Sequence, residues 1–275
     1  MGSLTDSHLI CIKGFGADDI FVGGADGTML HYNGSEWTQM DTKGRWAIKC
    51  LWGTGSDNLY AVCTDGKILH YDGSGWGVED TENLPPLTGI WGLAADEIYA
   101  CSRIGKILKY DGNEWQFMRT GTDVDITRLW GCKEGGMYAV GYDGLVLKLE
   151  GDRWVRMTLM TGSELYGIYG FSPTDIYMVG SDGAIFKFNE SEFTEMPSST
   201  MNFFLDVWGP NNEMVFAVGD EGMIMYLDGD QWTRIESNTE EYLTSIWGTS
   251  EDNIYSVGDN GTIIHWDGED WKPVD

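Results

Sequence analysis

The sequence predicts an all-β protein, folded as a seven-bladed β-propeller with four antiparallel strands in each blade. Three observations indicate this fold: a unit of 39 residues occurs seven times, each unit holds four short β-rich runs, and no segment shows a sustained helical period. Four-stranded units of about 40 residues, repeated in series, are typical of β-propellers.

The repeat is clearest in columns of residues spaced 39 apart. The glycine column is Gly27, Gly66, Gly105, Gly144, Gly183, Gly222 and Gly261. A Tyr/Phe column is Phe21, Tyr60, Tyr99, Tyr138, Tyr177, Phe216 and Tyr255, and a Trp/Phe column is Trp37, Trp76, Trp115, Trp154, Phe193, Trp232 and Trp271. Aligned units start near residues 8, 47, 86, 125, 164, 203 and 242, without insertion or deletion. We therefore expect residues 1–275 to form a single propeller domain.

Each unit repeats the same four runs. In the last unit these are "YLTSIWG", "DNIYSVG", "GTIIHWDG" and "DWKPV", separated by Gly, Asn and Asp. The break "VGDNG" suits a hairpin whose turn needs positive φ. If the first run is the innermost strand, blade seven closes against blade one without a shared strand. The Tyr/Phe and Trp/Phe columns are then expected to fill the spaces between blades.

The blade pattern "WG…D.IYAVG..G.ILHYDG..W" resembles that of bacterial β-propeller repeat proteins, over essentially the whole chain. More loosely, it is similar to Asp-box and photosystem II assembly factor propellers. The Asp-Gly-x-x-Trp turn occurs at Asp72, Asp111, Asp228 and Asp267; it drifts at Asn33 and Glu150, and "FNESEF" in blade five lacks its glycine. The resemblance implies the fold. It does not select a function, because such families include lectins, assembly factors, hydrolases and adaptors.

The chain is strongly acidic, with 44 acids against 17 lysines and arginines and a formal net charge of -27. This charge argues against direct binding to nucleic acid. Most of it is predicted on one face, in the loops after the first and third strands, where Asp57 and Asp111 lie. That face either attracts basic partners or is acidic because Asp forms turns and keeps a Trp-rich protein soluble.

The links between blades form the other face, and their residues vary from unit to unit. Twelve of the 13 tryptophans belong to repeat columns; Trp46, in "DTKGRWAIK", does not. A Trp–Arg pair within an apolar rim suits a site of protein recognition. The candidate partner-binding residues are Arg45, Trp46, Lys49, Met201, Phe203 and Tyr242. Alternatively, Trp46 folds back on its neighbouring blade.

A further column lies on the first strand, closest to the axis. Its members are Lys13, Trp52, Trp91, Trp130, Tyr169, Trp208 and Trp247. If these side chains point inward they form a collar around the channel, with Lys13 as the one break, which would suit a sugar or a cation. If they turn into the blades they belong to the core.

No residue set in the sequence indicates a metal site, a cofactor or catalysis. His31, His70 and His265 share one column, but on third strands they are expected roughly 14 Å apart, too far to share a zinc ion whose ligands lie at about 2 Å. The five cysteines include no CxxC pair, which favours free thiols. Nucleophile elbows, H-E-x-x-H motifs and phosphate-binding loops are absent from the sequence.

Together these observations favour a non-enzymatic protein-binding module, in a specific version an inhibitor or immunity-type binder of a basic protein. The alternative is a carbohydrate-binding, lectin-like propeller, followed by a propeller lyase or hydrolase. No apolar run is long enough to span a membrane. We expect a monomer in the cytoplasm, or a secreted protein if a signal peptide has been removed.

Overall fold

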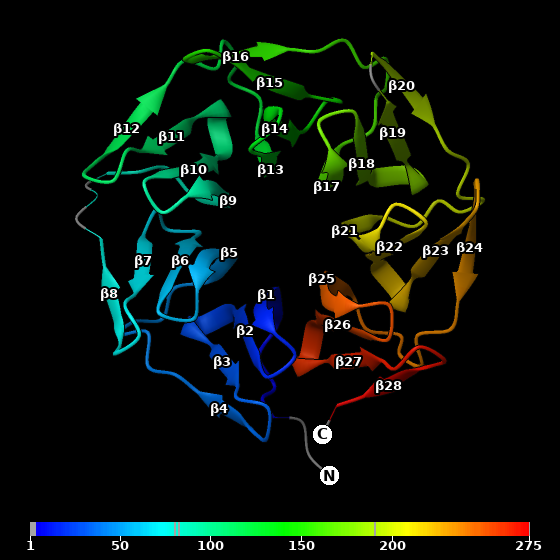
Figure 1. Cartoon of the computed structure of the whole chain (residues 1–275), viewed down its shortest axis with the longest axis horizontal. Coiled ribbons are helices and arrows are strands. Elements are labelled where there is room, and N and C mark those ends of the chain that lie inside the picture. The colour runs from blue at the N-terminus through cyan, green and yellow to red at the C-terminus, as the bar shows by residue number, and fades with distance from the viewer. Residues whose placement is uncertain (1–3, 80, 82, 190, 275) are drawn as a thin grey trace.

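The computed structural model describes residues 4–79, 81, 83–189 and 191–274. Within these residues, seven four-stranded antiparallel sheets are arranged around a central axis, and there is no α-helix (Figure 1). The prediction of a seven-bladed β-propeller is therefore confirmed.

In every blade the chain runs from the axis outward. The innermost strands are β1 (Leu9–Gly16), β5 (Ile48–Gly55), β9 (Leu87–Ala94), β13 (Ile126–Cys132), β17 (Leu165–Ser172), β21 (Phe204–Asn211) and β25 (Leu243–Ser250). The second strands are β2 (Asp19–Gly24), β6 (Asn58–Cys63), β10 (Glu97–Ser102), β14 (Gly136–Gly141), β18 (Asp175–Gly180), β22 (Met214–Gly219) and β26 (Asn253–Gly258). The third strands are β3 (Met29–Tyr32), β7 (Ile68–Tyr71), β11 (Ile107–Tyr110), β15 (Val146–Glu150), β19 (Ile185–Asn189), β23 (Ile224–Asp228) and β27 (Ile263–Trp266). The outermost strands are β4 (Trp37–Gln39), β8 (Trp76–Val78), β12 (Trp115–Met118), β16 (Arg153–Arg156), β20 (Glu192–Glu195), β24 (Gln231–Ile235) and β28 (Trp271–Pro273).

Tight turns containing the glycine column join the second and third strands. Five of them are short 3-10 segments: η1 (Ala25–Gly27), η2 (Arg103–Gly105), η3 (Ser181–Gly183), η4 (Asp220–Gly222) and η5 (Asp259–Gly261). In the last of these, Asn260 has φ 54° and Gly261 has φ 71°, so the expected positive-φ hairpin is confirmed. At six positions of this column, Gly27 to Gly222, a side chain would also collide with the neighbouring link: a Cβ on Gly27, for example, would overlap the carbonyl of Gly44.

The Asp-Gly-x-x-Trp turns join the third and fourth strands. In three of them the aspartate at the first position caps the turn, because its Oδ1 accepts hydrogen bonds from the two backbone N–H groups that follow the glycine. At Asp72 the acceptor also receives the Ser74 hydroxyl at 2.7 Å. These bonds favour the charged carboxylate and lower the pKa of Asp72 to about 2.

The innermost strands hold one another through an aromatic side chain on one blade and a glycine on the next. The rings of Trp52, Trp130, Trp208 and Trp247 lie against Gly92, Gly170, Gly248 and Gly14, respectively. Trp91 makes the equivalent contact by donating its indole N–H to the carbonyl of Gly131 at 2.9 Å. Each of these glycines directly follows a member of the Lys/Trp/Tyr column. A Trp-Gly dipeptide therefore provides a ring that packs against the next blade and a glycine that leaves space for the ring of the preceding blade.

The two outer aromatic columns meet between blades, as predicted. The Tyr/Phe residue of one blade packs edge-on against the Trp of the next: Tyr99 and Trp154 lie 6.2 Å apart at 87°, and Phe216 and Trp271 lie 6.1 Å apart at 89°. The buried apolar side chains of the described residues accordingly fall into seven clusters that lie between adjacent blades.

Blade seven meets blade one without exchanging a strand, which confirms the expected closure. The junction is instead formed by packing: Leu9 and Ile12 of blade one share a cluster with Tyr255 and Val257 of blade seven. The Thr244 hydroxyl adds a hydrogen bond to the Leu9 carbonyl at 2.8 Å.

Replacing Gly14 with alanine tests this closure. The new Cβ would overlap the six-membered ring of Trp247, so we expect the free energy of unfolding to fall by about 1–3 kcal/mol, as for other overpacked core sites. Gly75→Ala is the matched control, because a Cβ there meets no atom within 4 Å. Urea unfolding followed by tryptophan fluorescence measures both; equal stabilities for the two variants would contradict the ring-on-glycine contact.

Candidate functional site

The links between blades are fixed to the second-to-third-strand turns, and together they form what we call the link-loop face. The glycine N–H of a turn donates to a carbonyl of the link, as from Gly183 to Asn202 at 2.9 Å. A link hydroxyl returns a bond to the same turn, as from Ser198 to the Gly183 carbonyl at 2.7 Å. Within the link, Thr200 Oγ1 accepts the Asn202 N–H at 3.1 Å. The link before blade six is therefore an ordered segment rather than a loose loop.

Large apolar side chains are exposed in three successive links of this face. Met160 lies in the link before blade five and is 90% exposed. Met201 and Phe203 precede blade six, with exposed fractions of 71% and 41%, and Tyr242 precedes blade seven at 48%. The ring centroids of Phe203 and Tyr166 lie 6.3 Å apart. We call Met160, Met201, Phe203 and Tyr242 the apolar arc.

The structure separates the remaining members of the predicted partner-binding set. Arg45 is exposed. Trp46 is half-buried: its ring covers Gly44 and packs against the core cluster between blades one and two. Lys49 is three residues further on, inside β5, where it lines a cavity at the axis. Sequence position alone thus grouped three residues that occupy different environments.

The acidic turns lie on the opposite face of the ring, which we call the acidic face. First-to-second-strand and third-to-fourth-strand turns lie side by side there, since Cβ atoms on Gly34 and Gly73 would contact Asp18 and Asp57. Several carboxylates already serve the fold, as Asp72 does in its turn. Others, such as Asp57 and Asp96, are exposed.

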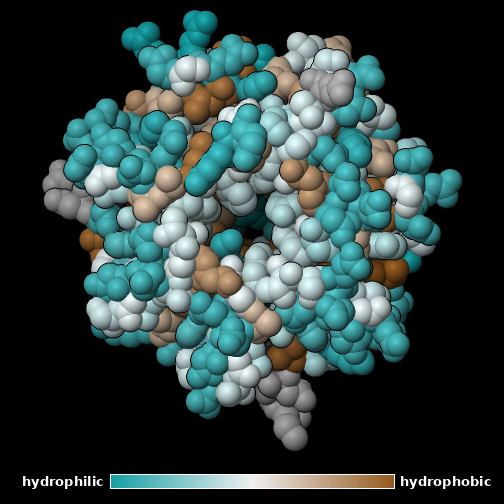
Figure 2. Space-filling view, viewed as in Figure 1, coloured by the Kyte–Doolittle hydropathy of each residue, from teal (hydrophilic) through white to brown (hydrophobic). Residues whose placement is uncertain are grey.

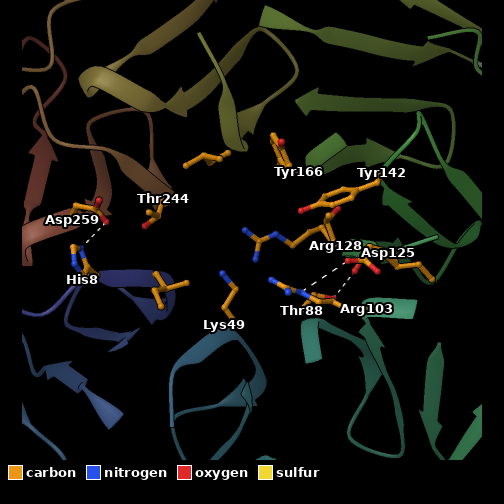
Figure 3. A pocket seen from close by; sticks show the side chains of 14 residues that line it. His8, Lys49, Thr88, Arg103, Asp125, Arg128, Tyr142, Tyr166, Thr244 and Asp259 are labelled. Atoms are coloured by element: carbon orange, nitrogen blue, oxygen red, sulfur yellow. Dashed lines mark hydrogen bonds and ion pairs between the residues drawn. The ribbon is translucent and has the colours of Figure 1, made fainter. Parts of the chain in front are cut away.

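A cavity of about 400 Å³ lies at the axis on the link-loop side (Figure 3). Figure 2 shows an opening at the centre of the ring in the view of Figure 1. Its lining comes from the beginnings of the innermost strands and from the second-to-third-strand turns: His8, Ile10, Lys49, Thr88, Arg103, Asp125, Ile126, Thr127, Arg128, Tyr142, Tyr166, Leu205, Thr244 and Asp259. Figure 3 shows the amine of Lys49 and the guanidinium groups of Arg103 and Arg128 turned toward the same open space. We call this space the axial pocket.

A second cavity of about 280 Å³ lies further along the axis, toward the acidic face. Lys13, Trp91, Tyr169, Trp208 and Trp247 contribute to its wall, whereas Trp52 and Trp130 do not. The first-strand column therefore has two roles. The rings of Trp52, Trp130, Trp208 and Trp247 pack against glycines of the next blade. Four rings of the column, those of Trp91, Tyr169, Trp208 and Trp247, also border the channel. Lys13 lies 5.5 Å from the ring centroid of Phe15.

Arg128 contributes to the lining of both cavities. Its Nη1 lies 3.5 Å from Cys50 Sγ of blade two, and its Nε is buried without a hydrogen-bond partner among the described residues. Burial disfavours the charged guanidinium, but the Asp206 carboxylate and Cys50 outweigh it, so the pKa of Arg128 is raised. Asp206 itself accepts the Ser245 hydroxyl at 2.7 Å and the Ile246 N–H at 3.2 Å.

The sequence contains a signal for this charged pair that the repeat analysis does not use. Two residues before the Lys/Trp/Tyr column lies a column of small side chains: Cys11, Cys50, Gly89, Arg128, Gly167, Asp206 and Ser245. Arg128 and Asp206 are its only long or charged members, and they carry opposite charges. A charged departure from a small-residue column on the innermost strand is thus a marker of the channel.

The histidine column has a structural role in this fold. His31 and His70 stack on Phe21 and Tyr60 at centroid distances of 4.2 and 4.3 Å. His265 lies 4.4 Å from Tyr255 with the two rings tilted by 35°. Each Nε2 is also hydrogen-bonded to the side chain of Asp19, Asn58 or Asn253 at 2.7–2.8 Å. Among the described residues, no group of three or more His, Cys, Asp or Glu side chains is arranged to hold a metal ion. No helix of the described chain is long and apolar enough to cross a membrane.

Comparison with known proteins supports the fold. No protein-family model matches the sequence, and a search of curated proteins finds no match. Among solved structures, YCF48 from Cyanidioschyzon merolae has 16% identity and a TM-score of 0.78, with 97% of each chain covered.

Two further solved structures show the same fold. YCF48 bound to D1 peptide has 16% identity and a TM-score of 0.79, over 97% of this chain and 95% of that one. U3-55K has 12% identity and a TM-score of 0.75, over 92% and 89%. The YCF48 propellers loosely match the photosystem II assembly factors to which the repeat is similar. At these identities the likeness shows the fold alone.

The thiols provide a test of how closed the channel wall is. Burial raises the pKa of Cys63 and Cys101 to about 12 and raises that of Cys11 further, while Cys132 is only partly buried. Because the thiolate is the reactive form, we expect iodoacetamide at pH 8 to label Cys132 first and to leave these three thiols almost unmodified. Mass spectrometry of the native protein measures this, with urea-unfolded protein as control. Fast labelling of Cys11 would show that the wall opens.

Proposed function

We propose that this chain is a non-enzymatic protein-binding β-propeller that contacts its partner through the link-loop face. The observation that carries the proposal is the apolar arc. The arc places exposed methionine and aromatic side chains on one face of the ring, and these residue types are enriched in protein interfaces. Their links are held by hydrogen bonds to the blades, so little conformational entropy is lost when a partner binds.

The finer version of the proposal concerns charge. The acidic face would be offered to basic surfaces, and the partner would be a basic protein that this chain inhibits or neutralises, as an immunity protein does. The net charge of -27 supports this version because it would accelerate encounter with a basic protein. The two faces are compatible, since a partner can be attracted by the acidic field and bound at the apolar arc.

The repeated aromatic columns give less support to a carbohydrate-binding function. In the outer column, Trp76, Trp154, Trp232 and Trp271 are buried between blades, so their ring faces are covered rather than available to a sugar. In the first-strand column, Trp91, Tyr169, Trp208 and Trp247 border the second cavity, but the rings of Trp208 and Trp247 are also packed against glycines of the next blade. The exposed side chains of the apolar arc, in contrast, do not recur in every blade: Phe203 and Tyr242 share one repeat position, and the other five units have no Phe, Tyr or Trp there. Contacts confined to a few blades suit a protein partner better than a set of equivalent sugar sites.

A pull-down from the native source tests the proposal. The baits are the wild type, Met201→Ser/Phe203→Ser/Tyr242→Ser, and Val78→Ser/Phe117→Ser, which removes exposed apolar side chains from the outer strands instead. We expect one protein to be captured by the wild type and the outer-strand variant. The arc variant should lose it, with an affinity at least about tenfold lower, because apolar anchors contribute more than about 1 kcal/mol each.

Two arms of the same experiment locate the contact. Capture that is lost at high salt for every bait would place the contact on the acidic face. An Arg45→Ala/Trp46→Ala bait examines the other sector of the link-loop face. Equal capture by the wild type and the arc variant, or no captured protein at all, would contradict the proposal, and a glycan array would then test the carbohydrate alternative.

A further inference from the structure

The axial pocket contains positive charge that the protein itself does not neutralise. Arg103 lies 4.0 Å from Asp125, and His8 lies 3.0 Å from Asp259. Lys49 is different: among the described residues, no carboxylate lies within ion-pair distance of its amine, and it makes no hydrogen bond. Arg128 has the distant charge of Asp206 but no ion pair within 4.0 Å among the same residues. Two cations therefore face the pocket without a direct counter-ion.

Such an arrangement is costly unless an anion completes it. Burying a charge without a partner is unfavourable, and two like charges that share a low-dielectric space repel each other. Lys49 reflects both effects, because burial and the nearby charges of Arg128 and Arg103 lower its pKa. Arg128 cannot relieve the repulsion by losing its proton, since a guanidinium stays charged in proteins. A negatively charged group between Lys49 and Arg128 would offset both the cost of burying these charges and their mutual repulsion.

The rest of the pocket indicates what such an anion would carry. Tyr142 and Tyr166 form one wall, with their rings 6.2 Å apart and nearly perpendicular at 86°. In Figure 3 the hydroxyl of Tyr142 lies on the pocket side, where it can donate to an anion. Ile126 and Leu205 add apolar lining. The volume of about 400 Å³ lies within the range of small-molecule sites.

We propose that the axial pocket binds an oxyanion, a carboxylate or a phosphate, attached to a small apolar or aromatic body. The oxyanion lies between Lys49 and Arg128 and accepts charge-assisted hydrogen bonds from both. The apolar body packs against Tyr142 and Tyr166. This site does not depend on the protein-binding proposal, because it requires no partner at the apolar arc.

Calorimetric titration with defined probes tests the site in phosphate-free buffer. The probes are phenyl phosphate, benzoate and inorganic phosphate, with benzyl alcohol as the uncharged counterpart. We expect phenyl phosphate and benzoate to bind the wild type, inorganic phosphate to bind more weakly, and benzyl alcohol not to bind. A short peptide that ends in phenylalanine, with a free or an amidated C-terminus, shows whether the pocket prefers an oxyanion on a free molecule or at the end of a chain.

Lys49→Gln is the decisive variant, and Lys133→Gln, on the acidic face, is its matched control. Losing one charge-assisted hydrogen bond should weaken phenyl phosphate binding about tenfold to a hundredfold, while the control should bind as the wild type does. Lys49→Gln should fold without loss of Tm, because it removes a partly buried charge that has no direct counter-ion. Arg128→Gln should weaken phenyl phosphate binding by a similar factor. If Arg128→Gln does not fold, Lys49→Gln alone tests the proposal.

Thermal unfolding gives an independent measurement. A ligand that binds only the native state raises Tm, so phenyl phosphate should raise the Tm of the wild type and of Lys133→Gln but not that of Lys49→Gln. The proposal is overturned if no anionic probe gives heat or a Tm rise with the wild type. Equal binding by Lys49→Gln, or binding of benzyl alcohol as tight as that of phenyl phosphate, would also overturn it.

Discussion

The contact between an aromatic ring on one innermost strand and a glycine on the next sets the geometry of the whole ring. The ring of Trp52 lies where a side chain on Gly92 would otherwise be, and the same relation recurs around the axis. Because close-packed interiors tolerate little change in volume, this contact fixes how near adjacent blades can approach at the axis. The larger aromatic pairs further out, such as Tyr99 with Trp154, then fill the widening space between blades.

Much of the fold could be predicted from the sequence because its packing requirements repeat. A glycine that must have positive φ, as Gly261 does, or a Tyr that must meet a Trp, as Tyr99 does, is needed once in every blade, so spacing alone reveals it. The axial pocket follows a different logic. The side chains of Cys50 and Arg128 meet at the axis although 78 residues separate them. The repeat shows that the two residues occupy equivalent positions on the innermost strands, but it does not show that the Arg128 side chain reaches across to Cys50. Trp46 is the converse case: it is unique in the sequence, yet its ring covers Gly44.

The axial cavities hold a larger share of positive charge than the acidic face does. Of the 17 lysines and arginines, four line the two axial cavities of the described structure, together with three aspartates, Asp125, Asp206 and Asp259, whereas carboxylates predominate in the surrounding turns of the acidic face. The summed field of those carboxylates favours positive charge at the axis and so reduces the cost of burying Lys49 and Arg128. It also opposes the approach of free anions, so only a ligand with strong local contacts would remain bound.

The hydrogen bonds that fix each link to its turn have a consequence for how this protein can change. Gly183, Ser198 and Thr200 hold the link before blade six by backbone groups and short side chains. The residues that follow, Met201 and Phe203, project from a segment whose path does not depend on them. New side chains can therefore be tried at such positions without cost to the blades. A propeller of this kind keeps a constant frame and a set of independently variable link segments, so the surface that the links present can evolve faster than the fold.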